Sequence, residues 1–250
     1  MSRVLIPALN EQERLPALFE ALAKQQSPVE PIVIDNWSQD ATAEIAESCG
    51  ATILREEEPG QMRAIQKGIK FILDNYQDSE AIFIIDADTK PLKSWSSAHL
   101  RHARRPGQYN NLQYGRVHHA YPWTVEGTVV RVGRATYIDS AEFWRRFQSK
   151  PPRAKGSNTC LVNPDKTLLE STLSIPNYGL GNDIALRDHI LARGGSARYL
   201  YDIRASVVSS GDRYPTLQSA LKRMVTPRKG QIDAYKEDFG KFDTYPNLEL

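Results

Sequence analysis

The chain has 250 residues, with 25% charged and 40% hydrophobic side chains and a formal net charge of +2 at pH 7. This is the composition of an ordinary soluble globular protein, and so small a net charge excludes an argument for a polyanionic partner from charge alone. The two cysteines, Cys49 and Cys160, are too few for a disulfide framework and favour a reduced compartment.

The first half of the chain predicts strands and helices in alternation. Asn10 and Glu13 have the chemistry of a capping box before the first helix. Asp40 is expected to cap the second helix and Gly50 to end it, and Gly60 is expected to open a third. Short apolar runs indicate strands at residues 4–6, 32–34, 52–54 and 81–85. This alternation is typical of a Rossmann-like, mostly parallel sheet with helices on both faces.

The second half is less regular and predicts a smaller, mixed structure. We expect helices at 141–147, 183–192 and 217–224, a loop entering a strand over 155–162, one or two strands within 199–208, and a polar tail from residue 226. The chain has no internal repeat and no low-complexity linker, so we expect one compact domain with halves at 1–98 and 99–250.

The same sequence carries expectations about location. It contains no apolar run of transmembrane length, and the first predicted strand begins too close to Met1 to leave room for a signal peptide. We therefore expect a cytoplasmic protein, which is compatible with a peripheral contact to a membrane.

Two aspartates follow the most apolar of the predicted strands. Asp86 and Asp88 come directly after the run Ala81–Ile85, which has the pattern of a strand buried on both faces. Side chains two residues apart in an extended segment point the same way, so both carboxylates are expected to face one site at the carboxyl edge of the sheet. Such a pair favours a divalent cation shared with substrate phosphates. An isolated Asp-x-Asp is otherwise more often a solvated turn.

Several motifs in order carry a resemblance to a known family. They are Ile6-Pro7-Ala8-Leu9-Asn10-Glu11, then Val33-Ile34-Asp35-Asn36-Trp37-Ser38-Gln39-Asp40-Ala41-Thr42, then Gly60 with Arg63 and Gly68, then Ile84-Ile85-Asp86-Ala87-Asp88, and later Gly156-Ser157-Asn158 and Gly181-Asn182-Asp183. Together they resemble the nucleotide-sugar glycosyltransferases of family 2, over roughly residues 3–213. The resemblance implies the α/β A-type glycosyltransferase fold with an Asp-x-Asp (DxD) motif, Mn²⁺ or Mg²⁺, and a nucleoside-diphosphate sugar as donor.

The resemblance also implies a division of labour. Residues 1–98 would bind the nucleotide sugar, with Asp86 and Asp88 as metal ligands, and residues 99–250 would bind the acceptor. Asp35 would contact the base or ribose and Arg63 a phosphate; turn chemistry and a solvated surface position are their alternatives. The donor site implied in this way comprises Pro7, Leu9, Asn10, Glu11, Asp35, Ser38, Gly60, Arg63, Asp86, Ala87, Asp88 and Arg213.

Asp183 is the residue that the resemblance marks for catalysis. In inverting relatives an acid at this place, usually preceded by Glu, takes the proton from the acceptor hydroxyl, which would make this chain an inverting hexosyltransferase-like enzyme. Here Asn182 stands where Glu is usual, while the acid that corresponds to the base is present. The alternative role for Asp183 is that of a helix N-terminal acid.

Two basic regions remain. The first, with interleaved aromatics, comprises Arg101, His102, Arg104, Arg105, Tyr109, Tyr114, Arg116, His118, His119, Tyr121, Trp123, Arg131 and Arg134; the second comprises Arg213, Lys222, Arg223, Arg228 and Lys229. The first could hold an anionic acceptor or glycan, and its alternative is a solvated loop. In relatives, basic residues of a C-terminal segment cover the donor diphosphate.

Three other functions stay open at this point. A sugar-phosphate nucleotidyltransferase would normally carry a glycine-rich basic loop after the first strand, where this chain has Pro7-Ala8-Leu9-Asn10-Glu11. A nucleic-acid-binding module would use the first basic region and bind in a steeply salt-dependent way. A non-catalytic relative would bind nucleotide alone.

Overall fold

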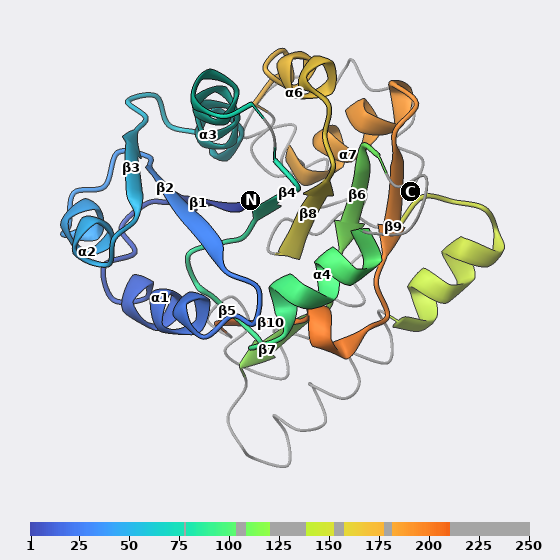
Figure 1. The fold of residues 1–250 in the computed structure, drawn as a ribbon, viewed down its shortest axis with the longest axis horizontal. Helices are drawn as coiled ribbons and strands as arrows, with labels where there is room; N and C mark the ends of the chain where they lie inside the picture. The colour runs from blue at the N-terminus through green and yellow to red at the C-terminus, as the bar shows by residue number, and fades with distance from the viewer. Residues whose placement is uncertain (78, 104–108, 121–138, 153–157, 178–181, 211–250) are drawn as a thin grey trace, which may run out of the picture.

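The computed structural model describes the chain except residues 78, 104–108, 121–138, 153–157, 178–181 and 211–250. Its main feature is a seven-stranded sheet with helices on both faces (Figure 1). In spatial order the strands are β3 (Thr52–Arg55), β2 (Val29–Asp35), β1 (Ser2–Ala8), β4 (Ala81–Ile84), β8 (Thr159–Val162), β6 (Asn111–Tyr114) and β9 (Ser196–Tyr199). A second sheet of three strands has the order β5 (Thr89–Pro91), β10 (Val207–Ser210) and β7 (Val117–Ala120).

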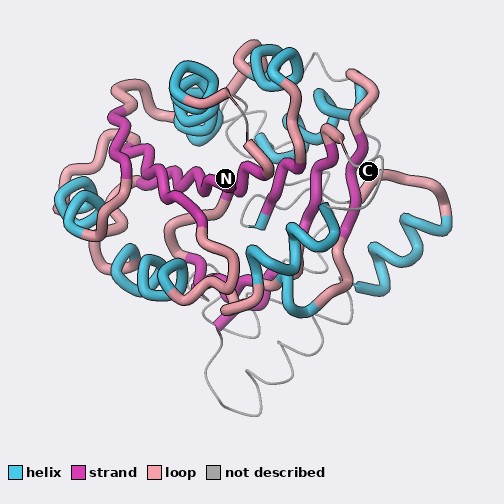
Figure 2. Tube along the Cα trace, viewed as in Figure 1, coloured by secondary structure: helices cyan, strands magenta, loops and turns pink. Residues whose placement is uncertain are grey.

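Helices cover the large sheet from above and below (Figure 2). The layer below consists of α1 (Leu15–Ala23), α2 (Thr42–Ser48) and α4 (Trp95–Ala103), and the layer above of α3 (Gln61–Asn75), α6 (Lys166–Thr172) and α7 (Asn182–Ala192). The chain also forms a helix over 139–147 and a 3₁₀ turn at Ile203–Ala205. The predicted mostly parallel α/β architecture is therefore confirmed.

Alternation along the central strands sets the two cores. In β1, Val4 and Ile6 pack with α1 and α4, whereas Leu5 between them packs with α3 on the other face. Phe83 and Ile84 of β4 divide in the same way. Burial on both faces is what an unbroken apolar run predicts, because each face of a central parallel strand is covered by helices.

Strand pairing places the ends of the first strands together. The strands β3, β2, β1 and β4 are parallel, with Ala8 beside Asp35 and Leu5 beside Ile84. The N–H of Asn36 donates to the carbonyl of Ala8 at 2.8 Å, so the loops after β1 and β2 leave the sheet side by side. Ligands of open α/β sheets bind at this carboxyl edge.

Gly68 explains how close α3 lies to the sheet. A Cβ atom at this position would come within 2.7 Å of Cδ2 of Leu5 and 3.1 Å of Cδ1 of Ile34. Any larger residue would push the helix away from β1 and β2. The glycine of the third motif therefore has a packing role.

Several local predictions were wrong. Helix α1 starts only at Leu15 after Arg14, without a side-chain cap, so Asn10 and Glu13 form no capping box. Helix α2 is preceded by Ala41 and not directly by Asp40, although Asp40 Oδ1 still accepts the N–H of Thr42 at 3.0 Å. Gly50 and Gly60 were predicted correctly; both have positive φ, of 81° and 146°, at the end of α2 and the start of α3.

The second half differs from simple alternation at β8. This strand runs antiparallel to both β4 and β6, which makes the sheet mixed. The helices predicted from Ala141 and from Asp183 are confirmed. The predicted helix 217–224 and the polar tail lie outside the described residues.

Candidate active site at the carboxyl edge of the sheet

Asp86 and Asp88 lie in a tight turn and not in an extended segment. The carbonyl of Asp86 accepts hydrogen bonds from the N–H of Thr89 at 3.1 Å and from its hydroxyl at 2.7 Å. The argument from strand periodicity was therefore wrong for this pair. Both residues are nevertheless partly exposed, although Oδ1 of Asp88 is buried, and the buried Ala87 lies between them.

Neighbouring elements hold the two carboxylates from different sides. Gln61, at the start of α3, donates from Nε2 to Oδ1 of Asp86 at 3.2 Å. Ser209 of β10 donates from its hydroxyl to Oδ2 of Asp88 at 3.1 Å. This hydrogen bond ties the small sheet to the turn after β4.

The acidic turn influences a third carboxylate. Burial raises the pKa of Glu11, its hydrogen bond with Arg14 opposes this, and the negative charges of Asp88 and Asp86 raise the pKa further. The carboxylate of Glu11 is therefore repelled by the negative charges of both aspartates, and a divalent cation bound there would reduce this repulsion. Hard oxygen ligands of this kind suit Mg²⁺ or Mn²⁺. Within the described residues no group of three or more His, Cys, Asp or Glu side chains is arranged to hold a metal.

Asp35 and Ser38 join the loops after β1 and β2. Asp35 is 6% exposed, and its Oδ1 accepts the N–H of Ser38 at 3.1 Å. The hydroxyl of Ser38 accepts the N–H of Asn10 at 2.9 Å, and Oδ1 of Asn10 accepts the N–H of Gln39 at 2.8 Å. The turn chemistry that was the alternative for Asp35 is therefore present, and through Ser38 it orders both loops.

A hollow of about 400 Å³ opens beside these loops. Asp35 and Ser38 line it together with Trp37, a residue that is 57% exposed and has a φ of 71°. The other lining residues are mostly acidic: Asp40, Ala43, Glu44, Arg55, Glu56 and Glu57. An acidic wall repels phosphate, so the hollow suits the uncharged base and ribose of a nucleotide better than its phosphates.

Gly60 closes the loop that precedes α3. Its N–H donates to Oδ1 of Asn36 at 2.8 Å, and Nδ2 of Asn36 donates to the carbonyl of Glu58 at 2.8 Å. A Cβ at Gly60 would lie 2.1 Å from Nδ2 of Asn177. Arg63, expected to reach a phosphate, forms an ion pair with Glu58, so a phosphate would have to displace that partner.

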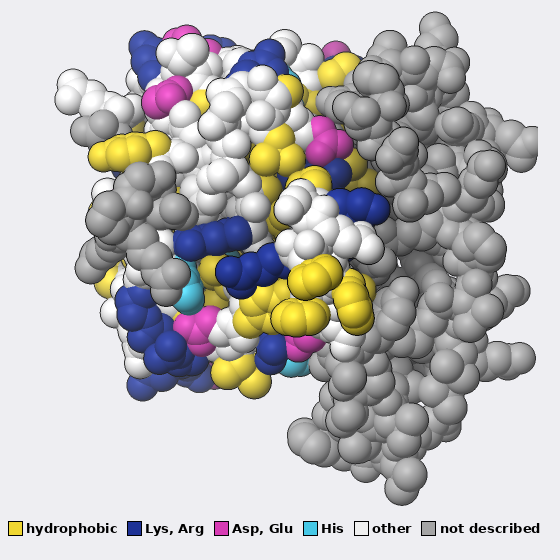
Figure 3. Space-filling view, turned by 90° about the vertical axis from the view of Figure 1, so that its right-hand side faces the viewer, with side chains coloured by type: hydrophobic (Ala, Val, Ile, Leu, Met, Phe, Trp, Pro, Cys, Tyr) yellow, Lys and Arg dark blue, Asp and Glu magenta, His cyan; other side chains and the backbone are white. Residues whose placement is uncertain are grey.

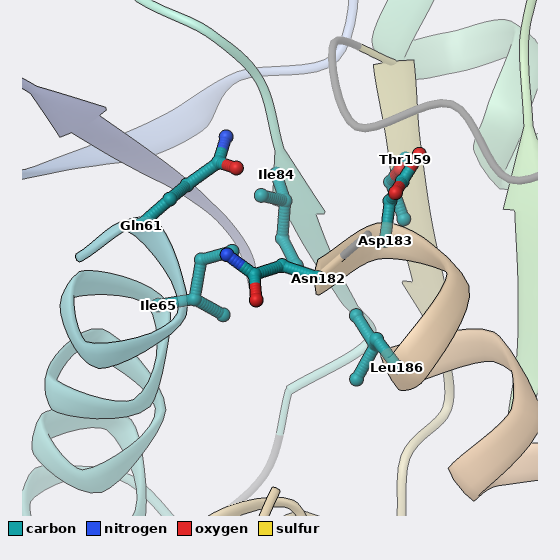
Figure 4. Close-up of a pocket in the computed structure, with 7 residues that line it drawn as sticks. All are labelled: Gln61, Ile65, Ile84, Thr159, Asn182, Asp183 and Leu186. Carbon is teal, nitrogen blue, oxygen red and sulfur yellow. The ribbon is translucent and has the colours of Figure 1, made fainter. Parts of the chain in front are cut away.

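Asp183 lies in the first turn of α7, on a small pocket that Gln61, Ile84 and Thr159 also line (Figure 4). Its Oδ1 accepts the N–H of Ile184 at 2.9 Å, so a local cap-type contact exists as well. Tyr114 donates from its hydroxyl to the Asp183 carbonyl at 3.5 Å. Burial raises the pKa of Tyr114 well above its ordinary value, with a further contribution from the charge of Asp183.

The structure adds residues that sequence analysis missed and leaves others undescribed. Gln61 and Asn36 were not predicted as site residues, although Asn36 belongs to the second motif and Gln61 directly follows the motif residue Gly60. Arg116 is paired with Asp139 at 2.6 Å and His102 with Asp202 at 3.5 Å, so these members of the first basic region have acidic partners. Outside the described residues lie Arg104, Arg105, Tyr121, Trp123, Arg131, Arg134, Arg213, Lys222, Arg223, Arg228 and Lys229.

Comparison with curated proteins gives short but clear matches. The chain is 36% identical over 89 residues to 4,4'-diaponeurosporenoate glycosyltransferase of Staphylococcus haemolyticus (strain JCSC1435), which covers 35% of this chain and 24% of that protein. The protein of the same name from Staphylococcus aureus (strain USA300) is 32% identical over 96 residues, covering 36% and 24%. The chain therefore spans about a quarter of the length of these relatives.

Comparison with solved structures supports the fold. Glucosyl-3-phosphoglycerate synthase from Mycobacterium tuberculosis, in complex with phosphoglyceric acid, superposes with a TM-score of 0.55 at 18% identity, over 84% of this chain and 70% of that one. The same protein with Mn²⁺, uridine diphosphate and phosphoglyceric acid gives 0.53 at 19% identity, over 80% and 67%. This likeness confirms the expected A-type glycosyltransferase fold.

In the described part of the chain, no helix combines the length and the apolar character that a membrane span needs.

A family model identifies the chain. Residues 3–160, more than half of the chain, match the model of the family described as glycosyl transferase family 2. The chain belongs to glycosyl transferase family 2.

Proposed function

We propose that this chain transfers a sugar from a nucleoside-diphosphate sugar to an acceptor hydroxyl, with a divalent cation at Asp86 and Asp88. The observation that carries the proposal is the position of Gln61. Its amide donates to Asp86, and the same residue lines the pocket that contains Asp183. One residue of α3 therefore links the pair proposed to bind the metal to the proposed base, as a single reaction site requires.

The donor is proposed to lie along the carboxyl edge of the sheet. Its base and ribose would occupy the hollow at Asp35 and Trp37, and its diphosphate would extend toward Asp86 and Asp88. A cation held there supplies neutralising charge to the leaving diphosphate. The solved neighbours were crystallised with Mn²⁺ and uridine diphosphate or with Mg²⁺ and uridine diphosphate, which supports this choice of ligands.

The remaining donor-site residues have supporting parts in the proposal. The segment after β1 would frame the nucleotide, Gly60 would allow the α3 loop its close approach, and Arg63 would exchange its ion pair with Glu58 for a phosphate. This set comprises Pro7, Leu9, Asn10, Glu11, Ser38, Gly60, Arg63, Ala87 and Arg213, the last of which lies outside the described residues. Residues 1–98 would thus form the donor half and residues 99–250 the acceptor half.

Asp183 is proposed as the general base. Its carboxylate would take the proton of the acceptor hydroxyl while the acceptor oxygen bonds to the anomeric carbon and the bond from that carbon to the diphosphate breaks. The anomeric carbon has oxocarbenium-like character at this point, as in glycoside hydrolysis. A single displacement of this kind inverts the anomeric configuration.

A binding panel tests the donor assignment. Thermal unfolding would be followed with uridine, guanosine, cytidine, adenosine and thymidine diphosphates, each with and without Mn²⁺. We expect one nucleotide to raise the melting temperature, and to do so more strongly with Mn²⁺, since selective binding to the folded state stabilises it by mass action. No shift with any nucleotide would contradict the proposal.

A product assay separates the proposal from its rivals. Incubation with the selected nucleotide sugar, Mn²⁺ and a panel of hydroxyl-bearing acceptors should release nucleoside diphosphate and form a glycosylated acceptor. A nucleotidyltransferase would instead form a nucleotide sugar and pyrophosphate from nucleoside triphosphate and sugar phosphate. A nucleic-acid-binding module would instead show binding that weakens steeply with salt.

A further inference from the structure

The helix over residues 139–147 has its large apolar side chains on the exposed side, whereas a core helix has them on the buried side. At about 100° per residue, Phe143, Trp144 and Phe147 fall on one side of it. These side chains are 60%, 59% and 77% exposed. The Trp144 ring makes edge contacts with both phenylalanines, at centroid distances of 6.2 and 6.0 Å, so the three form one exposed aromatic cluster.

The inner side of the same helix is polar. Asp139 accepts hydrogen bonds from Tyr199 at 3.0 Å and pairs with Arg116 at 2.6 Å, while Glu142 is only 2% exposed. Arg145 donates from Nε to the carbonyl of Pro151 at 2.8 Å. Asp139 thus attaches the helix to the domain through polar contacts with Tyr199 and Arg116, while the aromatic side chains are mostly exposed.

Basic side chains border the aromatic cluster. Arg146 and Lys150 are exposed, and Arg145 is partly exposed. The two acids of the helix are turned to the protein, since Asp139 is paired and Glu142 is buried. Figure 3 shows hydrophobic side chains gathered on this side of the molecule with Lys and Arg beside them. Among the described side chains of this helix and of the residues just after it, the outward charges are therefore positive.

An exposed aromatic cluster with a basic border fits one kind of partner best. Exposed clusters of large apolar side chains mark sites of interaction, and a protein partner or a membrane can cover them. Trp and Phe with flanking Lys and Arg are typical of helices that lie in the interface of a bilayer, with the aromatic side among the acyl chains and the cations at the headgroups. Anionic headgroups add an attraction of about fivefold in affinity for each basic residue near the surface.

We propose that Phe143, Trp144 and Phe147, with Arg146 and Lys150, dock this protein on an anionic phospholipid surface. The helix stands beside β9, at the end of the large sheet away from β3 (Figure 1). Docking there would leave the carboxyl ends of β1 and β2, at the other end of the sheet, free for a soluble donor. The inference does not depend on the proposed function.

Vesicle binding tests the proposal directly. The full chain would be sedimented with vesicles of equimolar phosphatidylcholine and phosphatidylglycerol and with vesicles of phosphatidylcholine alone. We expect binding to the anionic vesicles that weakens with added salt and falls at least about tenfold without phosphatidylglycerol. No binding to the anionic vesicles, or equal binding to both, would overturn the proposal.

Variants assign the binding to the helix. The triple change Phe143→Ser, Trp144→Ser and Phe147→Ser should remove vesicle binding, and Arg146→Gln with Lys150→Gln should weaken it at least about tenfold. Ile203→Ser is the matched control, because Ile203 is 57% exposed on another element, and it should bind as the wild type does. Wild-type binding by the triple variant would overturn the proposal. Unchanged melting temperatures would show that the variants are folded.

Two further measurements distinguish a membrane from a second copy of the chain as the partner that covers the aromatic cluster. Fluorescence of Trp144 should shift to shorter wavelength on the anionic vesicles, and Trp144→Phe should lose this signal while keeping the binding. If the chain instead self-associates without lipid, and the triple variant abolishes that association, then the cluster is an interface between two copies and the proposal is wrong.

Discussion

Gln61 donates a hydrogen bond to Asp86 across 3.2 Å, from the first residue of α3 to the turn after β4. Gly60, immediately before, has a φ of 146° and is bonded to Asn36. The start of α3 is therefore held between the loop after β2 and the acidic turn. Since Gln61 also lines the pocket that contains Asp183, one residue contacts the acidic turn and borders the pocket of the proposed base.

The first prediction concerns the proposed metal ligands. Asp88→Asn keeps the shape of the side chain, and Ser209 can still donate to its oxygen, but one negative charge is lost. We expect Mn²⁺-dependent binding of the nucleoside diphosphate to disappear while the melting temperature without ligand stays the same. Titration calorimetry with and without Mn²⁺ measures this. Asp74→Asn, on the exposed end of α3, is the control and should change nothing; wild-type sugar transfer by Asp88→Asn would show the assignment to be wrong.

A second prediction concerns Asp35. Asp35→Ala removes a carboxylate from the hollow and should weaken the affinity for the nucleoside diphosphate by roughly ten- to a hundredfold, the loss of a hydrogen bond to a charged group. Asp35 also accepts the backbone N–H of Ser38, and Asp35→Asn keeps an oxygen that can accept this bond, so Asp35→Asn serves as the comparison that separates loss of the carboxylate from damage to the loop. Equal isotherms for the wild type and Asp35→Ala would restrict Asp35 to its turn.

Asp183 allows a test of chemistry and stereochemistry together. Asp183→Asn preserves shape and removes basicity, so transfer should fall by roughly a hundred- to ten-thousandfold. Donor affinity should barely change, because Asp35, Asp86 and Asp88 remain. NMR of the product should show inversion at the anomeric carbon. Near-normal turnover would leave Asp183 with only a helix-terminal role, and a retained configuration would exclude it as the base of a single displacement.

Packing of α3 on the sheet gives a prediction about stability. Gly68→Ala would gain about 1 kcal/mol of helix propensity on an exposed surface. Here the new methyl group overlaps Leu5, which is fully buried, so we expect a net loss of about 1–2 kcal/mol in the free energy of unfolding. Urea denaturation measures it. Combining Gly68→Ala with Leu5→Val should relieve the overlap and give a favourable coupling energy; a stabilised single variant would contradict the packing argument.

Stability should also depend on pH through His99. This imidazole is fully buried, with Nδ1 3.1 Å from Oε1 of Gln113, and burial lowers its pKa from 6.5 to about 4. Below pH 6.5 the unfolded chain therefore binds a proton that the folded protein does not, so stability is lost as the pH falls toward 4. Between pH 8 and pH 5 the loss from this group should be about 2 kcal/mol.

The control for this effect is His99→Gln, which should be less stable at pH 8 but should lose less stability on acidification. Urea denaturation of both proteins at several pH values isolates the contribution, because the other titrating groups are shared. Parallel pH profiles would show that His99 is not the group responsible.

The sequence by itself determined the elements whose signals are local. Unbroken apolar runs such as Ala81–Ile85 can be buried only between two helical layers, and glycines such as Gly50 and Gly60 occur where the backbone takes a positive φ. These signals predicted the first strands, their helices and the edge at which Asp35, Asp86 and Asp88 lie. The ordered motifs also sufficed to predict the family.

Tertiary structure decided everything that depends on contacts between distant segments. The reversal of β8, the turn at Asp86, and the contacts of Gln61 with Asp86 and of Ser209 with Asp88 follow from the packing of elements that are far apart in the sequence. The same holds for the helix over 139–147, whose sequence predicts a helix but does not tell which side faces water. Tyr199 of β9 and Arg116, between β6 and β7, hold Asp139 of the helix against the domain, and the aromatic side of the helix is exposed.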